Sequence, residues 1–193
     1  MLLRVFSILI LPLLLLAQVY YFHFQRYSVL YDTDLKIPIE GSATIYGEEV
    51  KVSNKKRLSF RPYPGLDKRL QASNKDFYKL GYDKGHTIIS DDSSDFNIDV
   101  LKESYYFVNI TPQTSHTNRS LFRKLEIYFR KLALKYGKIQ VITIVLPSDK
   151  FIGNGVNVPR GFIKMIVLPN NTLFRCFYIP NNKTGRIKPF ECQ

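Results

Sequence analysis

The sequence predicts an α+β fold built around a mostly antiparallel sheet. Three stretches rich in β-branched residues predict strands, at 139–146, 162–168 and 173–179. One amphipathic helix is predicted over 118–136. Because the predicted strands outnumber the helix and do not alternate strictly with helices, the pattern is typical of the α+β class.

The composition indicates one folded domain in a basic chain. The 193 residues are 45% hydrophobic and 14% aromatic, which excludes a disordered protein. The 28 lysines and arginines exceed the 16 acidic residues, so the formal net charge is +12 at pH 7. A field of this sign attracts polyanions such as nucleic acid, anionic lipid surfaces or polysaccharide. A lysine-rich proteome is the alternative explanation, and charge alone does not choose between them.

Residues 1–26 have the pattern of an export segment. A short positive start is followed by an apolar run at 8–17, which matches the ~7–15 residues of a signal-peptide core. The apolar character continues further, so a membrane anchor counted over 5–24 is an equal alternative. Both alternatives predict an exported domain over 27–193, which is periplasmic, secreted, or anchored to the inner membrane and facing outward.

The chain between this segment and the helix predicts three local structures. Residues 43–52 predict a short hairpin that turns near Gly47. Residues 54–80 are basic and punctuated by proline, which predicts an irregular loop. Residues 104–110 are aromatic and β-branched, which predicts a strand.

The helix predicted over 118–136 has one apolar face and one basic face. Its apolar residues recur at steps of three and four: Leu121, Leu125, Tyr128, Phe129, Leu132 and Tyr136. Gly137 follows the last of them and predicts the end of the helix. Arginines and lysines occupy the other face.

Cys176 and Cys192 are the two cysteines of the chain. In the oxidising compartment that export implies, they are expected to form a disulfide. The alternative is a pair of free buried thiols. Neither cysteine has a histidine or second thiol at metal-ligand spacing, so a zinc site is not expected.

Three polar residues in the middle of the chain fit the requirements of phosphodiester hydrolysis. That reaction needs a base for water, a metal ion for the leaving oxygen and cations for the phosphate. His86 titrates near neutrality and can act as the base. The amide oxygen of Asn118 suits Mg²⁺, and Glu126 lies two helical turns further on, where a carboxylate can hold metal-bound water. Taken singly, each residue has a structural alternative: a loop histidine, a helix cap, and an ion pair with Arg123 or Arg130.

Three ordered motifs resemble a known nuclease family. They are Y-D-K-G-H at 82–86, N-I-T-P-Q at 109–113 and N-R-S-L-F-R-K-L-E at 118–126. The sugar-non-specific DNA/RNA endonucleases of the ββα-metal class typically show D-R-G-H, N-x-x-P-Q and N-x-x-x-W-x-x-L-E at similar separations. The resemblance covers most of the chain and includes V-P-R-G-F-I-K-M-I at 158–166. It implies a fold that contains a ββα-metal active-site motif.

The resemblance implies a role for each matching position. His86 would be the general base, Asn118 the direct protein ligand of Mg²⁺, and Glu126 the holder of a coordinated water. Asn109 would position the metal-site loop or the phosphate, and Asp83 would orient the motif. Mn²⁺ is expected to substitute for Mg²⁺.

The cations that hold the phosphate are less well defined by the motifs. The family has an arginine upstream of the first motif; Arg57 is the first choice for it and Arg61 the second. Lys84 stands where the family has arginine, and lysine lacks the bidentate guanidinium, so a weaker phosphate contact is expected. Phe122 replaces a tryptophan and is expected to preserve the packing.

Two further groups of side chains are open to two interpretations. His116 lies before the helix, where it contacts substrate or, as we favour, faces solvent. Asp91, Asp92, Asp95 and Asp99 do not have the spacing of a calcium loop, so a solvated loop is expected here and not a second metal site.

The sequence therefore predicts an exported, Mg²⁺-dependent endonuclease that hydrolyses DNA and RNA with little sequence preference and leaves 5′-phosphate ends. Its substrate contacts are expected on the phosphate backbone, so binding should weaken steeply with salt. The alternative from another class is a membrane-tethered nucleic-acid-binding protein with impaired catalysis, of which Lys84 would be the first sign.

Overall fold

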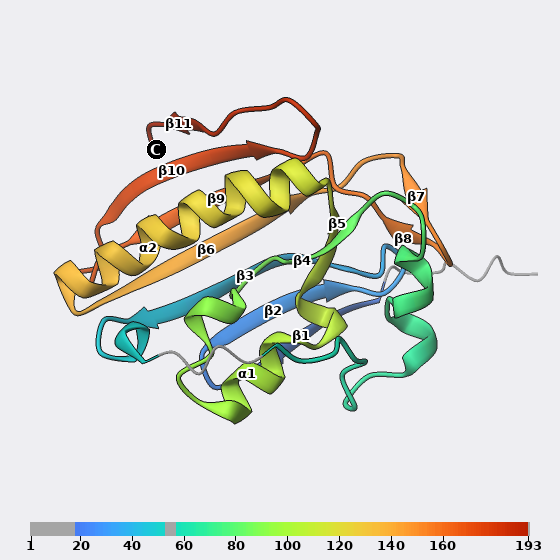
Figure 1. The fold of residues 1–193 in the computed structure, drawn as a ribbon, viewed down its shortest axis with the longest axis horizontal. Coiled ribbons are helices and arrows are strands. Elements are labelled where there is room, and N and C mark those ends of the chain that lie inside the picture. Colours follow the sequence, from blue (N-terminus) through green and yellow to red (C-terminus); the bar gives the residue numbers. More distant parts are fainter. Residues whose placement is uncertain (1–17, 53–56, 193) are drawn as a thin grey trace, which may run out of the picture.

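The structure, a computed structural model, describes residues 18–52 and 57–192. Its centre is a seven-stranded antiparallel sheet (Figure 1). In spatial order the strands are β1 (Val19–His23), β2 (Tyr27–Asp32), β3 (Ile37–Tyr46), β6 (Lys138–Leu146), β9 (Gly161–Val167), β10 (Leu173–Pro180) and β11 (Lys188–Phe190). The predicted α+β class with a mostly antiparallel sheet is confirmed, and β6, β9 and β10 are the three strands predicted from β-branched runs.

Two short ribbons and two α-helices complete the described part of the fold. β4 (Asp83–His86) pairs antiparallel with β5 (Ile110–Gln113), and β7 (Phe151–Ile152) pairs with β8 (Val156–Asn157). The helices are α1 (Ile98–Ser104) and α2 (Arg123–Tyr136), and the π-helical segment Thr117–Phe122 leads into α2. The short 3₁₀ turns are Glu49–Lys51, Lys68–Leu70, Asn74–Phe77, Asp91–Ser93 and Phe107–Asn109.

Helix α2 packs against the central sheet and forms the main core with it (Figure 1). Leu125 and Phe129 belong to the same cluster of buried side chains as Val141 on β6 and Ile166 on β9. Along β6, buried residues alternate with more exposed ones, as expected of a strand whose two faces differ in cover. The predicted helix is confirmed, and Gly137 ends it with a φ of 81°.

The hairpin predicted over 43–52 is wrong. The first residues of this range belong to β3, which pairs with β2 on one side and β6 on the other. The backbone N–H of Gly47 then donates to the carbonyl of Gly137, 2.7 Å away, and Glu49–Lys51 form a 3₁₀ turn. The partner strand β6 is remote in sequence, so no local pattern in 43–52 could reveal it.

The strand predicted over 104–110 is also wrong. Ser104 ends α1, Phe107–Asn109 form a 3₁₀ turn, and only Ile110 lies in a strand. The apolar side chains at 107, 108 and 110 are fully buried. These aromatic and β-branched residues are buried without pairing as a strand. Their β propensity therefore predicted a strand that is not present.

The irregular loop predicted over 54–80 is confirmed for its described part, apart from two 3₁₀ turns. The predicted export segment lies mostly outside the described residues, but Val19–His23 within it form β1 and pair with β2. Across residues 18–52 and 57–192, no helix combines the length and apolar character that a bilayer span requires.

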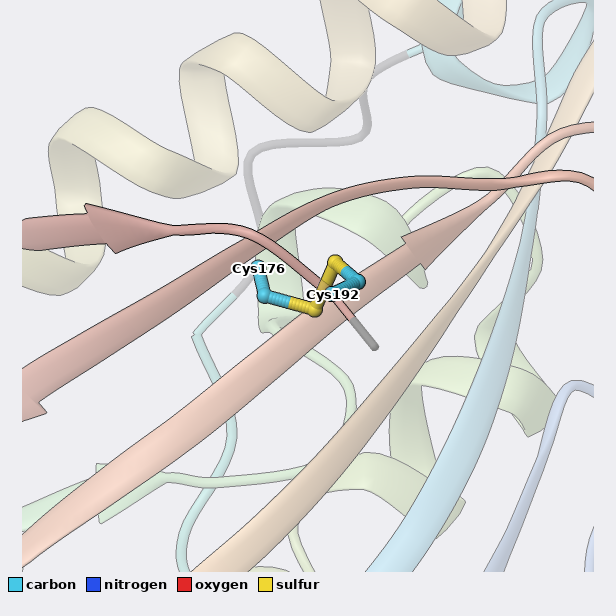
Figure 2. Close-up of a disulfide and its surroundings, with 2 residues drawn as sticks. All are labelled: Cys176 and Cys192. Carbon is cyan, nitrogen blue, oxygen red and sulfur yellow. A yellow bond between two sulfur atoms is a disulfide. The ribbon is translucent and has the colours of Figure 1, made fainter.

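The predicted disulfide between Cys176 and Cys192 is confirmed. Figure 2 shows the bridge, which joins β10 to the residues that follow β11, with the two Cα atoms 5.6 Å apart. β11 also pairs with β10. Residues 181–192, which follow β10, are therefore covalently linked to the sheet through Cys192. We call this segment the C-terminal strap.

Candidate active site

A cleft of about 1070 Å³ opens between β4, the turn Asp91–Ser93 and the first half of the α2 region. Its cationic lining residues are Arg57, Lys79, Lys84, Arg119 and Arg123. Its carboxylates are Asp83, Asp91, Asp92, Asp95 and Glu126, and it also contains His86 and Asn118. The structure thus brings together every predicted site residue except Asn109.

The side chain of Gln113 packs directly against Gly85, the residue before His86. In the β4–β5 ribbon, Gly85 faces Thr111 and His86 faces Ile110. A side-chain carbon added at Gly85 would collide with the side chain of Gln113. The amide nitrogen of Gln113 donates to the Thr111 hydroxyl at 3.3 Å and to the His86 carbonyl at 3.4 Å. The first two motifs are therefore the two strands of one ribbon, which fixes the backbone of His86.

Aromatic rings enclose the imidazole of His86. Its centroid lies 5.3 Å from that of Phe60 and 4.8 Å from that of Tyr105. Burial lowers the pKa of His86 below its usual value, and the carboxylates of Asp91 and Asp92 oppose this fall. Its Nε2 is buried and has no hydrogen-bond partner in the described part of the chain. The ring is therefore mainly neutral at pH 7 and free to accept a proton.

Asp83 holds the side chain of Asn118. The Nδ2 of Asn118 donates to Oδ2 of Asp83 at 3.1 Å, and Arg119 donates two bonds of 2.8 Å to the same carboxylate. Burial alone would raise the pKa of Asp83, but the bonds from Arg119 and Asn118 outweigh burial and lower it. With its amide nitrogen engaged, Asn118 has its amide oxygen available for a ligand. This agrees with the expectation that Asp83 orients the site.

Glu126 lies in the cleft without an ion-pair partner among the described residues. Arg130, one of the alternative partners, pairs instead with Asp92 at 3.3 Å. Burial raises the pKa of Glu126, and the positive charge of Lys164 partly counters the rise. The ion pair considered from sequence is therefore absent, and the carboxylate is available to bind a ligand in the cleft.

No role for Lys164 was predicted from the sequence. It is buried on β9, and its ammonium donates to the Thr87 carbonyl at 2.6 Å and to the Thr143 hydroxyl at 3.0 Å. Burial lowers the pKa of Lys164, while Glu126 opposes the fall. Because Thr87 follows His86, this lysine ties the central sheet to the backbone of the site. Its position in the motif V-P-R-G-F-I-K-M-I could have indicated that it belongs to the site.

The structure places the two candidates for the phosphate-binding arginine, Arg57 and Arg61, in different surroundings. Arg57 lines the cleft. The guanidinium of Arg61 instead lies 4.9 Å from the ring centroid of Tyr106 and is not among the cleft residues. Lys84 is in the cleft, where its ammonium donates to Oδ1 of Asn74 at 2.7 Å. This placement favours Arg57, the first choice.

Asn109 lies outside the cleft and is 0% exposed. Its Oδ1 accepts hydrogen bonds from the backbone N–H groups of Ile88 and Ile89. Its Nδ2 donates to the carbonyls of Ile89 and Ser104. These bonds fit the first of its two expected roles, positioning the loop that follows His86. Its full burial argues against a phosphate contact.

The solvated loop expected for the acidic residues is confirmed only in part: the side chains of Asp92 and Asp99 are 50% and 65% exposed. Asp91, Asp92 and Asp95 line the cleft, and Asp95 is buried. Asp99 lies apart and pairs with Lys102 at 2.8 Å. Among the described residues, no group of three or more His, Cys, Asp or Glu side chains is arranged to hold a metal ion.

The C-terminal strap contacts the turn that precedes the site asparagine. Nε2 of His116 donates to the carbonyl of Gly185 at 2.9 Å, so this histidine does not take the solvent-facing position that was favoured. The backbone N–H of Thr114 donates to Oδ1 of Asn181, also at 2.9 Å. The strap therefore braces the start of the helical region from outside the cleft.

The donor set fits a hard cation held by few protein atoms. Asn118 offers a neutral amide oxygen, and Glu126 offers a carboxylate in the same cleft. Mg²⁺ prefers oxygen ligands and keeps most of its waters, so it needs no cluster of protein ligands. Thiolates, which favour softer metals, are absent from the cleft lining.

Comparison with known proteins gives a consistent match. Residues 17–193 match the family described as DNA/RNA non-specific endonuclease. Nuclease EXOG, mitochondrial, from Xenopus laevis is 28% identical over 151 residues, which cover 69% of this chain and 42% of that protein. Endonuclease G, mitochondrial, from Homo sapiens is 25% identical over 154 residues, which cover 72% and 52%. The chain thus spans about half or less of the length of these relatives.

A solved structure shares the fold. It is the crystal structure of the EndoG/EndoGI complex, which superimposes with a TM-score of 0.74 at 24% identity. The match covers 84% of this chain and 74% of the other. The two proteins therefore share one fold over most of this chain.

Proposed function

Because this chain belongs to the DNA/RNA non-specific endonuclease family, we propose that it is a metal-dependent hydrolase that cuts phosphodiester bonds within DNA and RNA with little sequence preference. The observation that best supports this activity is the hydrogen bond from Asn118 to Asp83 in the cleft that contains His86. That bond leaves a hard oxygen ligand in the same cleft as a neutral base.

In this proposal His86 is the general base. Its burial keeps the imidazole neutral, so the ring can take a proton from an attacking water. Phe60 and Tyr105 hold the ring in place from two sides. The carboxylates of Asp91 and Asp92 stabilise the imidazolium that results, because each favours the protonated ring.

The phosphate is held by cations of the cleft: Arg57, Lys84 and Arg123. Asn118 would bind Mg²⁺, or Mn²⁺ as its substitute, directly, and Glu126 would do so through water. When bound, the ion supplies a Lewis acid for the phosphate and the leaving oxygen. Lys84 contributes a point charge without the bidentate geometry of arginine, so Arg57 carries the larger share of phosphate recognition.

We also propose that the products carry 5′-phosphate ends and that the protein acts outside the cytoplasm, free or tethered by its N-terminal segment. The apolar start of the sequence supports export. The disulfide between Cys176 and Cys192 supports it independently, because such bonds persist in oxidising compartments.

Incubation of supercoiled plasmid with the purified protein tests this function. We expect nicking and then full degradation with Mg²⁺, and no change in the plasmid with EDTA. A binding protein without catalysis would retard the plasmid on a gel but leave its length unchanged under both conditions. Full-length plasmid after incubation with Mg²⁺ or Mn²⁺ would therefore overturn the proposed activity.

A further inference from the structure

Three aromatic rings that line the cleft each have a lysine ammonium close by; we call these rings the aromatic wall. The ammonium of Lys84 lies 5.2 Å from the ring centroid of Phe60, and that of Lys79 lies 5.1 Å from the ring of Tyr78. The ammonium of Lys150 lies 5.2 Å from the ring centroid of Tyr82. All three rings line the cleft. One of the three, Phe60, also contacts His86, the proposed base.

Tyr78 is the outermost of these rings by exposure. It is 68% exposed although it lines the cleft. The backbone that follows it is unusual: Lys79 has a φ of 55° and Gly81 a φ of 77°. A positive φ is uncommon for a lysine and occurs where the surrounding structure or function imposes it. A lysine with a positive φ therefore directly follows a large aromatic ring that is open to a ligand.

We propose that this aromatic wall, with Tyr78 as its outer platform, is a stacking subsite for unpaired bases of a single strand. The proposal rests on the proposed nuclease function and adds a substrate form to it. A ring binds the face of a base, and every base has such a face, so stacking is compatible with low sequence preference. In a duplex the faces are covered by neighbouring base pairs, so the wall can engage only unpaired bases.

The paired lysines fit the same ligand. A single strand carries both bases and phosphates, and a ring with an ammonium group beside it offers a contact to each part. Phosphate contacts alone would account for the lysines but not for an exposed tyrosine at the rim. The subsite therefore predicts that affinity depends on the bases of the substrate as well as on its charge.

A binding experiment in the His86→Ala background with EDTA tests the subsite without cleavage. The probes are oligothymidylate, an abasic oligomer with the same number of phosphates, and a duplex of equal length. We expect Tyr78→Ala to weaken oligothymidylate binding by about 5-fold or more. Its effect on the abasic oligomer and the duplex should stay within about 2-fold, because those probes present no free base face.

Two further variants make the result specific. Tyr78→Phe keeps the ring and should bind oligothymidylate like the parent. Tyr21→Ala removes a tyrosine of similar exposure, 66%, on β1 outside the cleft, and should also bind like the parent. Equal losses for all three probes with Tyr78→Ala, or an equal loss with Tyr21→Ala, would overturn the subsite. The plasmid assay decides the nuclease function separately, since the binding comparison needs no cleavage.

Discussion

Oδ2 of Asp83 accepts a hydrogen bond from Nδ2 of Asn118, with 3.1 Å between the two atoms. The aspartate lies on β4 and the asparagine in the π-helical segment before α2, so this bond joins the first and third sequence motifs. This bond also determines which atom of the Asn118 side-chain amide is free. The carboxylate accepts the amide nitrogen, and the amide oxygen is left for a cation.

Replacement of Asp83 by alanine should therefore raise the Mg²⁺ concentration that half-maximal activity requires. Loss of a group that orients a metal ligand typically costs about 10- to 100-fold in metal affinity. The measurement is plasmid cleavage over a Mg²⁺ titration. Arg119→Ala is the comparator, because it removes the ion pair with Asp83 but keeps the bond to Asn118. A larger Mg²⁺ shift for Arg119→Ala than for Asp83→Ala would contradict this role.

The two arginines upstream of the base should behave differently. Arg57→Ala removes a cation that lines the cleft, so it should lower kcat/KM and reduce the salt dependence of substrate binding by about one phosphate contact. Arg61→Ala removes a guanidinium stacked on Tyr106 and bonded to the Lys102 carbonyl. It should mainly lower the free energy of unfolding. Substrate binding over a range of salt concentrations and unfolding in denaturant should be measured for both variants. A smaller salt dependence for Arg61→Ala alone would show that Arg61, and not Arg57, contacts the phosphate.

The pH dependence of activity should report the buried histidine. Burial lowers the pKa of His86, so the acid limb of kcat/KM should lie below the ordinary histidine value of 6.5. Asp91 opposes this fall, so Asp91→Asn should lower the pKa further and extend activity to lower pH. The chain has three histidines, so the His86 resonance can be assigned by its loss in His86→Ala and titrated directly. An acid limb that moves to higher pH in Asp91→Asn would contradict this electrostatic account.

The same shift predicts a change in stability with pH. As the pH falls through 6.5, the unfolded chain binds a proton at this histidine before the folded protein does. The contribution of His86 to the free energy of unfolding is therefore lost as the pH falls from the unfolded pKa toward the lower folded one. Unfolding curves of wild type and His86→Ala should diverge in their pH dependence over that interval. Parallel curves would show that the folded and unfolded pKa values of His86 do not differ.

Several parts of this account could be predicted from sequence because their signals are local. The period of Leu125 and Phe129 predicted α2, and the motifs predicted that His86, Asn118 and Glu126 share one site, which the cleft brings together. Family membership is likewise confirmed by the match over residues 17–193. These features depend on spacing along one segment or on an ordered set of motifs.

The parts that could not be predicted depend on contacts between distant segments. Nothing near Lys164 shows that its ammonium will reach the Thr87 carbonyl from the central sheet. Nothing near Asp91 shows that its carboxylate will lie in the same cleft as His86 and act on the pKa of that histidine. The aromatic run at 104–110 predicts a strand that the fold does not contain, because burial and β pairing favour the same residues.

The C-terminal strap should stabilise the start of the helical region. Cys192→Ser removes the disulfide but leaves the buried Cys176 in place, and it should lower the free energy of unfolding by up to about 3 kcal/mol. Amide exchange of Asn118, whose N–H donates to the Thr114 carbonyl, should accelerate in this variant and in reduced wild type. Faster exchange only within 181–192, with Asn118 unchanged, would show that the strap does not brace the site.

Cleavage of plasmid by His86→Ala with saturating Mg²⁺ is the most direct test of the central claim. The account predicts that the variant keeps the melting behaviour of a folded protein at neutral pH and loses degradation that the wild type performs in the same assay. Loss of the base leaves the cations and the metal ligand in place, so substrate binding should persist while cleavage stops. Degradation at the wild-type rate by folded His86→Ala would contradict the assignment of His86 as the general base.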